Sequence, residues 1–288
     1  DFLFYLSVDP ILRKNYHDQL TLSTLYAYSE HYILTLGSRD VGSLEEFMAK
    51  LPGDEKQKLA QVREAYSYMM VHPGCKMMAP GTDMPEGLAK CIQALNTLYK
   101  SSPALYQMDD EYDGFEWVQL MKYEENVITF LRKTEKPEET LLVICNFAAI
   151  PYENYQVGVP FAGKYKEIFN SDAAEFGGEG VVNSRVKTAK AEECDEREHS
   201  IKVKLPALGV SIYSCTPGKA PARKKVTAAK TAKDKTAKDK TAGKLVRTVK
   251  AKTPAKKSVK EEKAAKAEET VKAEKKAETV KKRATAKK

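Results

Sequence analysis

The chain lacks most of the features that mark secreted, membrane-spanning or metal-binding proteins. Its five cysteines are odd in number, far apart and outside any CxxC pattern, so they match neither a disulfide framework nor a zinc site. No apolar run approaches the roughly 20 residues that span a bilayer, and Asp1 to Leu6 resemble no signal peptide. We therefore predict reduced thiols, a cytoplasmic location and no membrane partner.

Histidine and tryptophan are also scarce. The four histidines, His17, His31, His72 and His199, are scattered, and none has the spacing of a metal ligand or of a nucleophile's partner. The single tryptophan, Trp117, falls on the same face of a predicted strand as Phe115, which favours core packing over stacking on a sugar ring. The sequence thus predicts no metal site and no cofactor within these 288 residues.

Charge divides the chain into two unlike parts. Residues 217–288 hold 26 Lys and Arg against 8 Asp and Glu, whereas residues 1–216 hold 22 against 32. The basic tail has no aromatic residue and repeats Lys-Thr-Ala-Lys-Asp, so we predict that it is disordered. Two roles stay open for it: a solubilising extension, or weak association with nucleic acid or another polyanion without base stacking.

Hydrophobic patterning predicts an α/β part followed by an all-β part. A helix within residues 18–34 leads into a strand near residues 32–36, and a second helix over residues 59–70 ends at His72-Pro73-Gly74. A strand over residues 75–79 and a helix over residues 88–99 follow. The later β-rich runs have the spacing of an antiparallel sandwich and cover Phe115–Met121, Val127–Arg132, Leu141–Phe147, Tyr155–Val159, Lys164–Asn170 and Ser200–Ser214.

An ordered set of short strings resembles the C-terminal part of bacterial glycogen branching enzymes, which belong to the alpha-amylase superfamily. The strings in the first half are Leu6-Ser7-Val8-Asp9-Pro10, Tyr26-Ala27-Tyr28-Ser29-Glu30, Pro52-Gly53-Asp54 with Gln57, and His72-Pro73-Gly74 with Lys76. Those in the second half are Pro103-Ala104-Leu105, Gly114-Phe115-Glu116-Trp117, Asn146-Phe147, Asn170-Ser171-Asp172, Gly177-Gly178, and Leu205-Pro206 with Leu208.

The resemblance implies the last quarter of a (β/α)8 barrel, then a β-sandwich. We expect a barrel remnant over residues 1–108, the C-terminal all-β domain over residues 109–216 and the disordered tail over residues 217–288. We also expect residues 109–216 to fold alone, because their strands can close a core. The start at Asp1, inside an apolar run, indicates a sequence cut from something longer.

The resemblance also implies that catalytic groups are missing. The family's nucleophile and acid/base carboxyls lie on earlier barrel strands, and a third carboxylate belongs to a His-Asp pair after a late strand. Ser38-Arg39 occupy that place here, or Ser38 alone replaces the Asp in a second register. Asp40 is a poor substitute, because a carboxylate one residue along a strand points to the opposite face. The segment from Pro80 to Gly87 is also shorter than the family's substrate-cleft loop.

We therefore expect a fragment or degenerate copy of a glycosyltransferase of glycogen biosynthesis, inactive in moving α-1,4-glucan segments to α-1,6 branches. Two alternatives stay open. One is a non-catalytic protein that associates with α-glucan or serves as a scaffold, and the other is a polyanion-binding protein that acts through its tail.

Overall fold

The computed structural model describes residues 2–17, 33–36, 43–77 and 84–218. Most of the predicted helix within residues 18–34, the Ser38-Arg39 motif, residues 80–83 of the segment 80–87 and nearly all of the tail lie outside the described residues. In chain order the elements of the first half are α1 (Phe2–Ser7), η1 (Arg13–Tyr16), β1 (Ile33–Leu34), α3 (Leu44–Lys50), α4 (Glu55–Val71), β2 (Cys75–Lys76), α5 (Glu86–Ser101) and η3 (Pro103–Leu105). Those of the second half are η4 (Tyr112–Gly114), β3 (Phe115–Gln119), β4 (Val127–Arg132), η5 (Pro137–Glu139), β5 (Leu141–Asn146), β6 (Tyr152–Val159), β7 (Gly163–Asn170), η6 (Ala174–Phe176), β8 (Lys187–Thr188), β9 (His199–Leu205) and β10 (Gly209–Pro217).

Helix α4 is the central helix of the first half, and its ends follow from local sequence. Asp54 accepts a hydrogen bond from Gln57 N at 2.8 Å, while the Gln57 side chain accepts one from Asp54 N at 3.1 Å, which makes a capping box. The helix ends before His72, where Pro73 and Gly74 follow, and Gly74 has a positive φ of 111° that favours glycine. The sequence prediction of this helix is confirmed.

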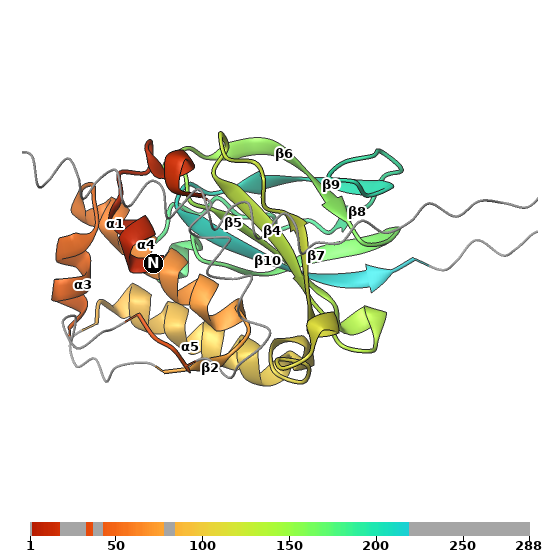
Figure 1. The fold of residues 1–288 in the computed structure, drawn as a ribbon, viewed down its shortest axis with the longest axis horizontal. Coiled ribbons are helices and arrows are strands. Elements are labelled where there is room, and N and C mark those ends of the chain that lie inside the picture. Colours follow the sequence, from red (N-terminus) through yellow and green to blue (C-terminus); the bar gives the residue numbers. More distant parts are fainter. Residues whose placement is uncertain (1, 18–32, 37–42, 78–83, 219–288) are drawn as a thin grey trace, which may run out of the picture. The chain divides into compact units, whose positions relative to one another are not determined.

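The second half forms an antiparallel sandwich. Six strands pair in the order β3-β4-β5-β10-β7-β8, and β6 pairs with β9 in a separate two-stranded sheet. Strands β4 and β5 are buried along their whole length because both faces of the larger sheet are covered (Figure 1). One face packs on β6 and β9, where Val127, Leu131 and Leu142 meet Val157 and Val203 in an apolar cluster.

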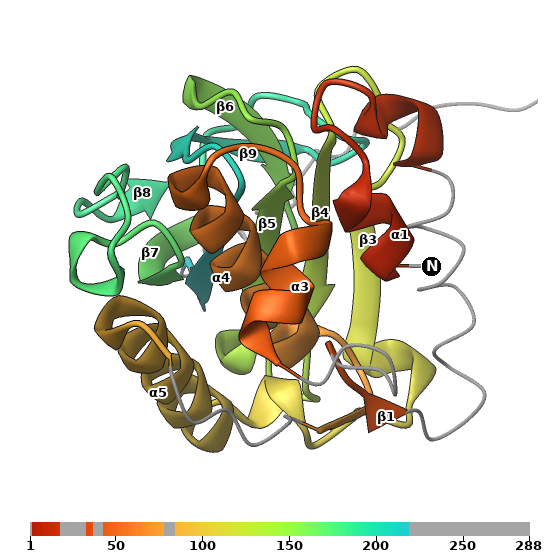
Figure 2. The same ribbon diagram turned by 90° about the vertical axis from the view of Figure 1, so that its left-hand side faces the viewer.

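The opposite face of the larger sheet packs on helices. Helix α4 contacts β5 and β10, and α5 contacts β7; Figure 2 shows both helices on the same side of the sheet. Ile128, Phe130 and Val143 share one apolar cluster there with Tyr68 and Met69 of α4. Residues before and after position 108 therefore contribute to a common core, and the described residues form one compact unit.

The α/β part contains one parallel pair of strands. Ile33 pairs with Cys75 and Leu34 with Lys76, and Met77 N donates to Leu34 O at 2.8 Å. The described residues hold no closed barrel. The other regular elements of this part include the helices α3, α4 and α5. The predicted order, α/β followed by an antiparallel sandwich, is confirmed.

Candidate functional site

The carboxyl ends of β1 and β2 mark where a barrel enzyme would build its active site, because such sites form at that end of the strands. The two strands run parallel, so both carboxyl ends lie at one edge. The residues that follow them, 37–42 and 78–83, include Ser38, Arg39 and Asp40 and lie outside the described residues. The replacement of the family's His-Asp pair by Ser38-Arg39 therefore stays a prediction from the sequence.

Beside β2 lies a cluster of charged groups centred on Asp109. Its carboxylate accepts a hydrogen bond from Gly74 N at 2.9 Å, contacts Lys76 Nζ at 3.5 Å and pairs with the buried Arg132 of β4. Burial lowers the pKa of Lys76 to about 8, opposed by the charge of Asp109. Burial also lowers the pKa of His72 to about 4, so its imidazole is neutral at pH 7. The cluster joins the end of α4, β2 and β4.

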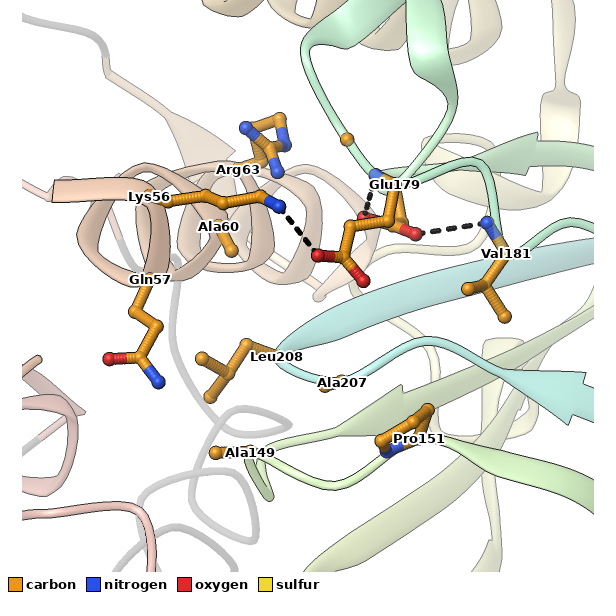
Figure 3. A pocket seen from close by; sticks show the side chains of 12 residues that line it. Lys56, Gln57, Ala60, Arg63, Ala149, Pro151, Glu179, Val181, Ala207 and Leu208 are labelled. Carbon is orange, nitrogen blue, oxygen red and sulfur yellow. Dashed lines mark hydrogen bonds and ion pairs between the residues drawn. The ribbon is translucent and has the colours of Figure 1, made fainter. Parts of the chain in front are cut away.

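A second place, which we call the α4 pocket, lies between α4 and the loops at one end of the sandwich (Figure 3). It encloses about 210 Å³. One wall is the face of α4 that carries Lys56, Ala60 and Arg63, spaced three and four residues apart. The other walls come from residues 149–151, residues 172–181 and residues 207–208.

The loop over residues 172–181 is held by the Asn170-Ser171-Asp172 string. The Asp172 carboxylate accepts hydrogen bonds from Glu179 N at 2.9 Å and from Val181 N at 3.0 Å. The Asn170 side chain donates to Val181 O at 3.0 Å. The loop also needs glycine, because Gly177 and Gly180 have φ of 79° and 81°. These bonds place Glu179 opposite α4.

The floor of the α4 pocket is held by Asn146, the last residue of β5. Its amide donates to Pro206 O at 2.7 Å and to Ile150 O at 2.9 Å, so it ties together the two loops below the pocket. Leu208 N donates to Ala148 O at 3.0 Å. Two strings of the family resemblance thus lie at this pocket. Asn146-Phe147 holds the loops below it, and Leu205-Pro206 with Leu208 contributes Leu208 to its lining.

Arg63 is the buried charged group on the α4 side of the pocket. The residue is 5% exposed, and its Nε donates to Ser171 O at 2.9 Å. Within the part of the chain that the structure describes, neither Nη atom has a hydrogen bond or a paired carboxylate. Burial lowers the pKa of Arg63, and Cys91 and Asp172 oppose this shift; an arginine stays charged all the same. At the mouth, Lys56 Nζ pairs with Glu179 Oε1 at 2.6 Å, and both side chains are exposed.

The structure places the other singled-out residues in the core or at the surface. Trp117 packs edge-on against Phe115 with ring centroids 4.9 Å apart, which confirms its place in the apolar cluster under the helices. His17 contacts Asn126 at 3.2 Å, His199 begins β9, and His31 lies outside the described residues. All five cysteines are free, and burial raises the pKa of Cys91 to about 12.

The described part of the chain has neither a metal-binding cluster nor a membrane-spanning helix. No group of three or more His, Cys, Asp and Glu side chains among these residues could hold a metal ion. None of their helices is long and apolar enough to cross a membrane.

Sequence reasoning did not identify Arg63 as a site residue. Its weak signal is a charged pair, Arg63-Glu64, inside a helix whose neighbouring residues are apolar. The partner of Arg63, Ser171, lies 108 residues later, so the pocket exists only in the folded chain.

The comparisons with known proteins match both halves of the described chain. The family of alpha amylase C-terminal all-beta domains matches residues 117–216. The 1,4-alpha-glucan branching enzyme GlgB of Oceanobacillus iheyensis is 35% identical over 235 residues, which are 74% of this chain and 37% of that protein. The enzyme of the same name from Aquifex aeolicus is 37% identical over 235 residues, 73% of this chain and 37% of that protein. The chain thus spans little more than a third of the length of these relatives.

Solved structures match more weakly. An alpha-amylase from Anoxybacillus is 11% identical with a TM-score of 0.41 and covers 72% of this chain and 42% of its own. The structure titled AmyP in complex with maltose is 12% identical with a TM-score of 0.47 and covers 71% and 45%. The family assignment therefore comes from the sequence matches: the chain is a relative of the bacterial 1,4-alpha-glucan branching enzymes and corresponds to the C-terminal part of such a protein.

Proposed function

We propose that this chain serves the branching reaction, the transfer of α-1,4-glucan segments to form α-1,6 branches, and that these 288 residues do not catalyse it alone. The observation that carries the first part is the 35–37% identity to branching enzymes over about three quarters of the chain. The second part rests on the sequence, because the resemblance places the nucleophile and the acid/base carboxyl on barrel strands that precede these residues.

The Ser38-Arg39 motif adds a chemical reason. Retaining glycosyl transfer passes through an oxocarbenium-like centre that carries positive charge. A fixed guanidinium at the place of a carboxylate opposes this charge, whereas the carboxylate would stabilise it. In either register the family's carboxylate is replaced, by Arg39 or by Ser38.

The partner we propose for the described unit is an α-glucan, in keeping with the relatives' names. For residues 217–288 we propose weak polyanion binding, because their 26 Lys and Arg outnumber 8 Asp and Glu. A cytoplasmic location is proposed on the five free cysteines.

Incubation of the purified chain with amylose tests the lack of catalysis. Branching shortens the linear segments and changes the iodine-staining spectrum. We expect no change beyond that of a heat-treated sample, with the Oceanobacillus iheyensis enzyme as the positive control. A change that grows with time and with the concentration of the chain would contradict the proposal.

A further inference from the structure

The α4 pocket combines free polar atoms of both kinds with an apolar floor. Both Nη atoms of Arg63 are available as donors, although the side chain is 5% exposed. Each oxygen of Asp172 accepts one backbone hydrogen bond and keeps capacity for another. Opposite these groups lie Pro151 and Leu208, whose surfaces are apolar.

The charge of the pocket selects the class of ligand. The pocket is lined by two cations, Lys56 and Arg63, and by two carboxylates, Asp172 and Glu179. The formal charge of its lining is therefore zero. An anion would meet both carboxylates, and a cation would meet both basic groups. A neutral molecule with many hydroxyls satisfies donors and acceptors together, because each hydroxyl can donate and accept.

Size and shape narrow the class further. The pocket of about 210 Å³ is smaller than the roughly 300–1,000 Å³ of pockets for drug-sized ligands. It suits one ring of a sugar whose C–H face lies on Pro151 and Leu208 while its hydroxyls reach Arg63 and Asp172. We propose that the α4 pocket binds one pyranose residue of a neutral glucan chain. That the sugar belongs to a glucan rests on the proposed function.

Methyl NMR of the full chain tests this inference at the pocket itself, because Leu208 methyl signals report on the floor. Titration with maltotetraose should shift these signals in a saturable way, whereas inorganic phosphate should not. Glycerol, a free polyol, should shift them only at much higher concentration. Phosphate acting at a lower concentration than maltotetraose would overturn the proposal in favour of an anion site. Equal action of glycerol and maltotetraose would overturn the glucan as the source.

Variants separate specific binding from general effects. Arg63→Gln should weaken maltotetraose binding by about tenfold or more, because hydrogen bonds to a charged group are lost. Ala207→Phe leaves Arg63 in place but fills the pocket, and it should abolish the shift. Thr97→Phe, which also introduces a phenylalanine but at an exposed position of α5, should leave binding unchanged. Full binding by Ala207→Phe would overturn the proposal.

Failure of this inference and failure of the proposed function are distinguishable. Branching of amylose by the chain would contradict the proposed function but would not affect the assignment of a sugar to the α4 pocket. A Leu208 signal that never responds to maltotetraose would overturn the pocket assignment and leave the branching result untouched.

Discussion

Replacement of Glu64 by glutamine probes the core that supports the α4 pocket. Glu64 is fully buried on α4, and neither carboxyl oxygen has a hydrogen-bond partner. The buried Arg13 donates instead to the carbonyl oxygens of Leu6 and Phe147 and to the side chain of Gln61. Burial raises the pKa of Glu64 well above its usual value, and the charge of Arg13 opposes this shift only in part. Burial without a hydrogen-bond partner therefore favours the protonated form of Glu64.

The sign of the pH dependence follows from proton binding. Above about pH 4.3 the unfolded chain releases the Glu64 proton, whereas the folded chain keeps it up to the raised pKa. The stabilising effect of the proton is present below the unfolded pKa and is lost as the pH rises towards the folded pKa. The loss is about 1.4 kcal/mol of unfolding free energy per pH unit in that window. Glutamine has nearly the same shape and no such proton, so Glu64→Gln removes this slope.

Urea unfolding at several pH values between about 5 and 7 measures the effect. The stability of Glu64→Gln relative to the native chain should rise with pH, by at most about 1.4 kcal/mol per pH unit. Glu179→Gln is the matched control, because the Glu179 carboxylate is exposed and pairs with Lys56, which lowers its pKa. A constant difference across the range would refute the reasoning. So would a loss of about 3–5 kcal/mol in Glu64→Gln at neutral pH, the cost of breaking a buried ion pair with Arg13.

Three further predictions concern the charge cluster, the thiols and the domain boundary. Asp109→Asn, which removes a carboxylate from buried Arg132, should cost about 2–3 kcal/mol in urea unfolding. Lys56→Gln, at an exposed ion pair, should cost clearly less; equal costs would contradict this ranking. Exposed Cys75 should react with an aromatic disulfide reagent long before Cys91 and Cys215, because burial raises the pKa of each of these two thiols to about 12; a single fast phase for all thiols would contradict it. Residues 109–216 expressed alone should melt with less cooperativity than the whole chain when followed by circular dichroism, because Phe130 and Val143 lose the cover of α4. An equally sharp melt would contradict this and support a domain boundary at residue 108.

Much of the fold could be predicted because local signals and the core agree. The helix over residues 59–70 appears as α4 over Glu55–Val71, and the strand Val127–Arg132 appears with the predicted bounds. In β9, Ile201 and Val203 are buried while Lys202 is exposed, as their alternation predicted. Helix α3 was missed although Ser43 and Glu46 form a capping box, because the helix has only seven residues.

What the sequence did not predict depends on contacts between distant segments. The helices that cover the larger sheet make the core continuous across position 108, which an apolar stripe on a helix cannot reveal by itself. The α4 pocket likewise forms where Arg63 meets the loop that follows β7, which is far along the chain. The strings of the family resemblance include residues of the loops around the pocket. The position of buried Arg63 beside these loops became visible only in the structure.

The central claim is that this chain corresponds to part of a branching enzyme whose Ser38-Arg39 motif prevents transfer, and complementation tests it most directly. The chain is mixed with the part of the Oceanobacillus iheyensis enzyme that it does not match, and branching of amylose is followed by iodine staining. We expect no activity with the native chain, and activity when Ser38→His and Arg39→Asp are combined or when Ser38→Asp is introduced, according to the register that holds. Activity of the mixture with the native chain would contradict the claim that the Ser38-Arg39 motif disables transfer.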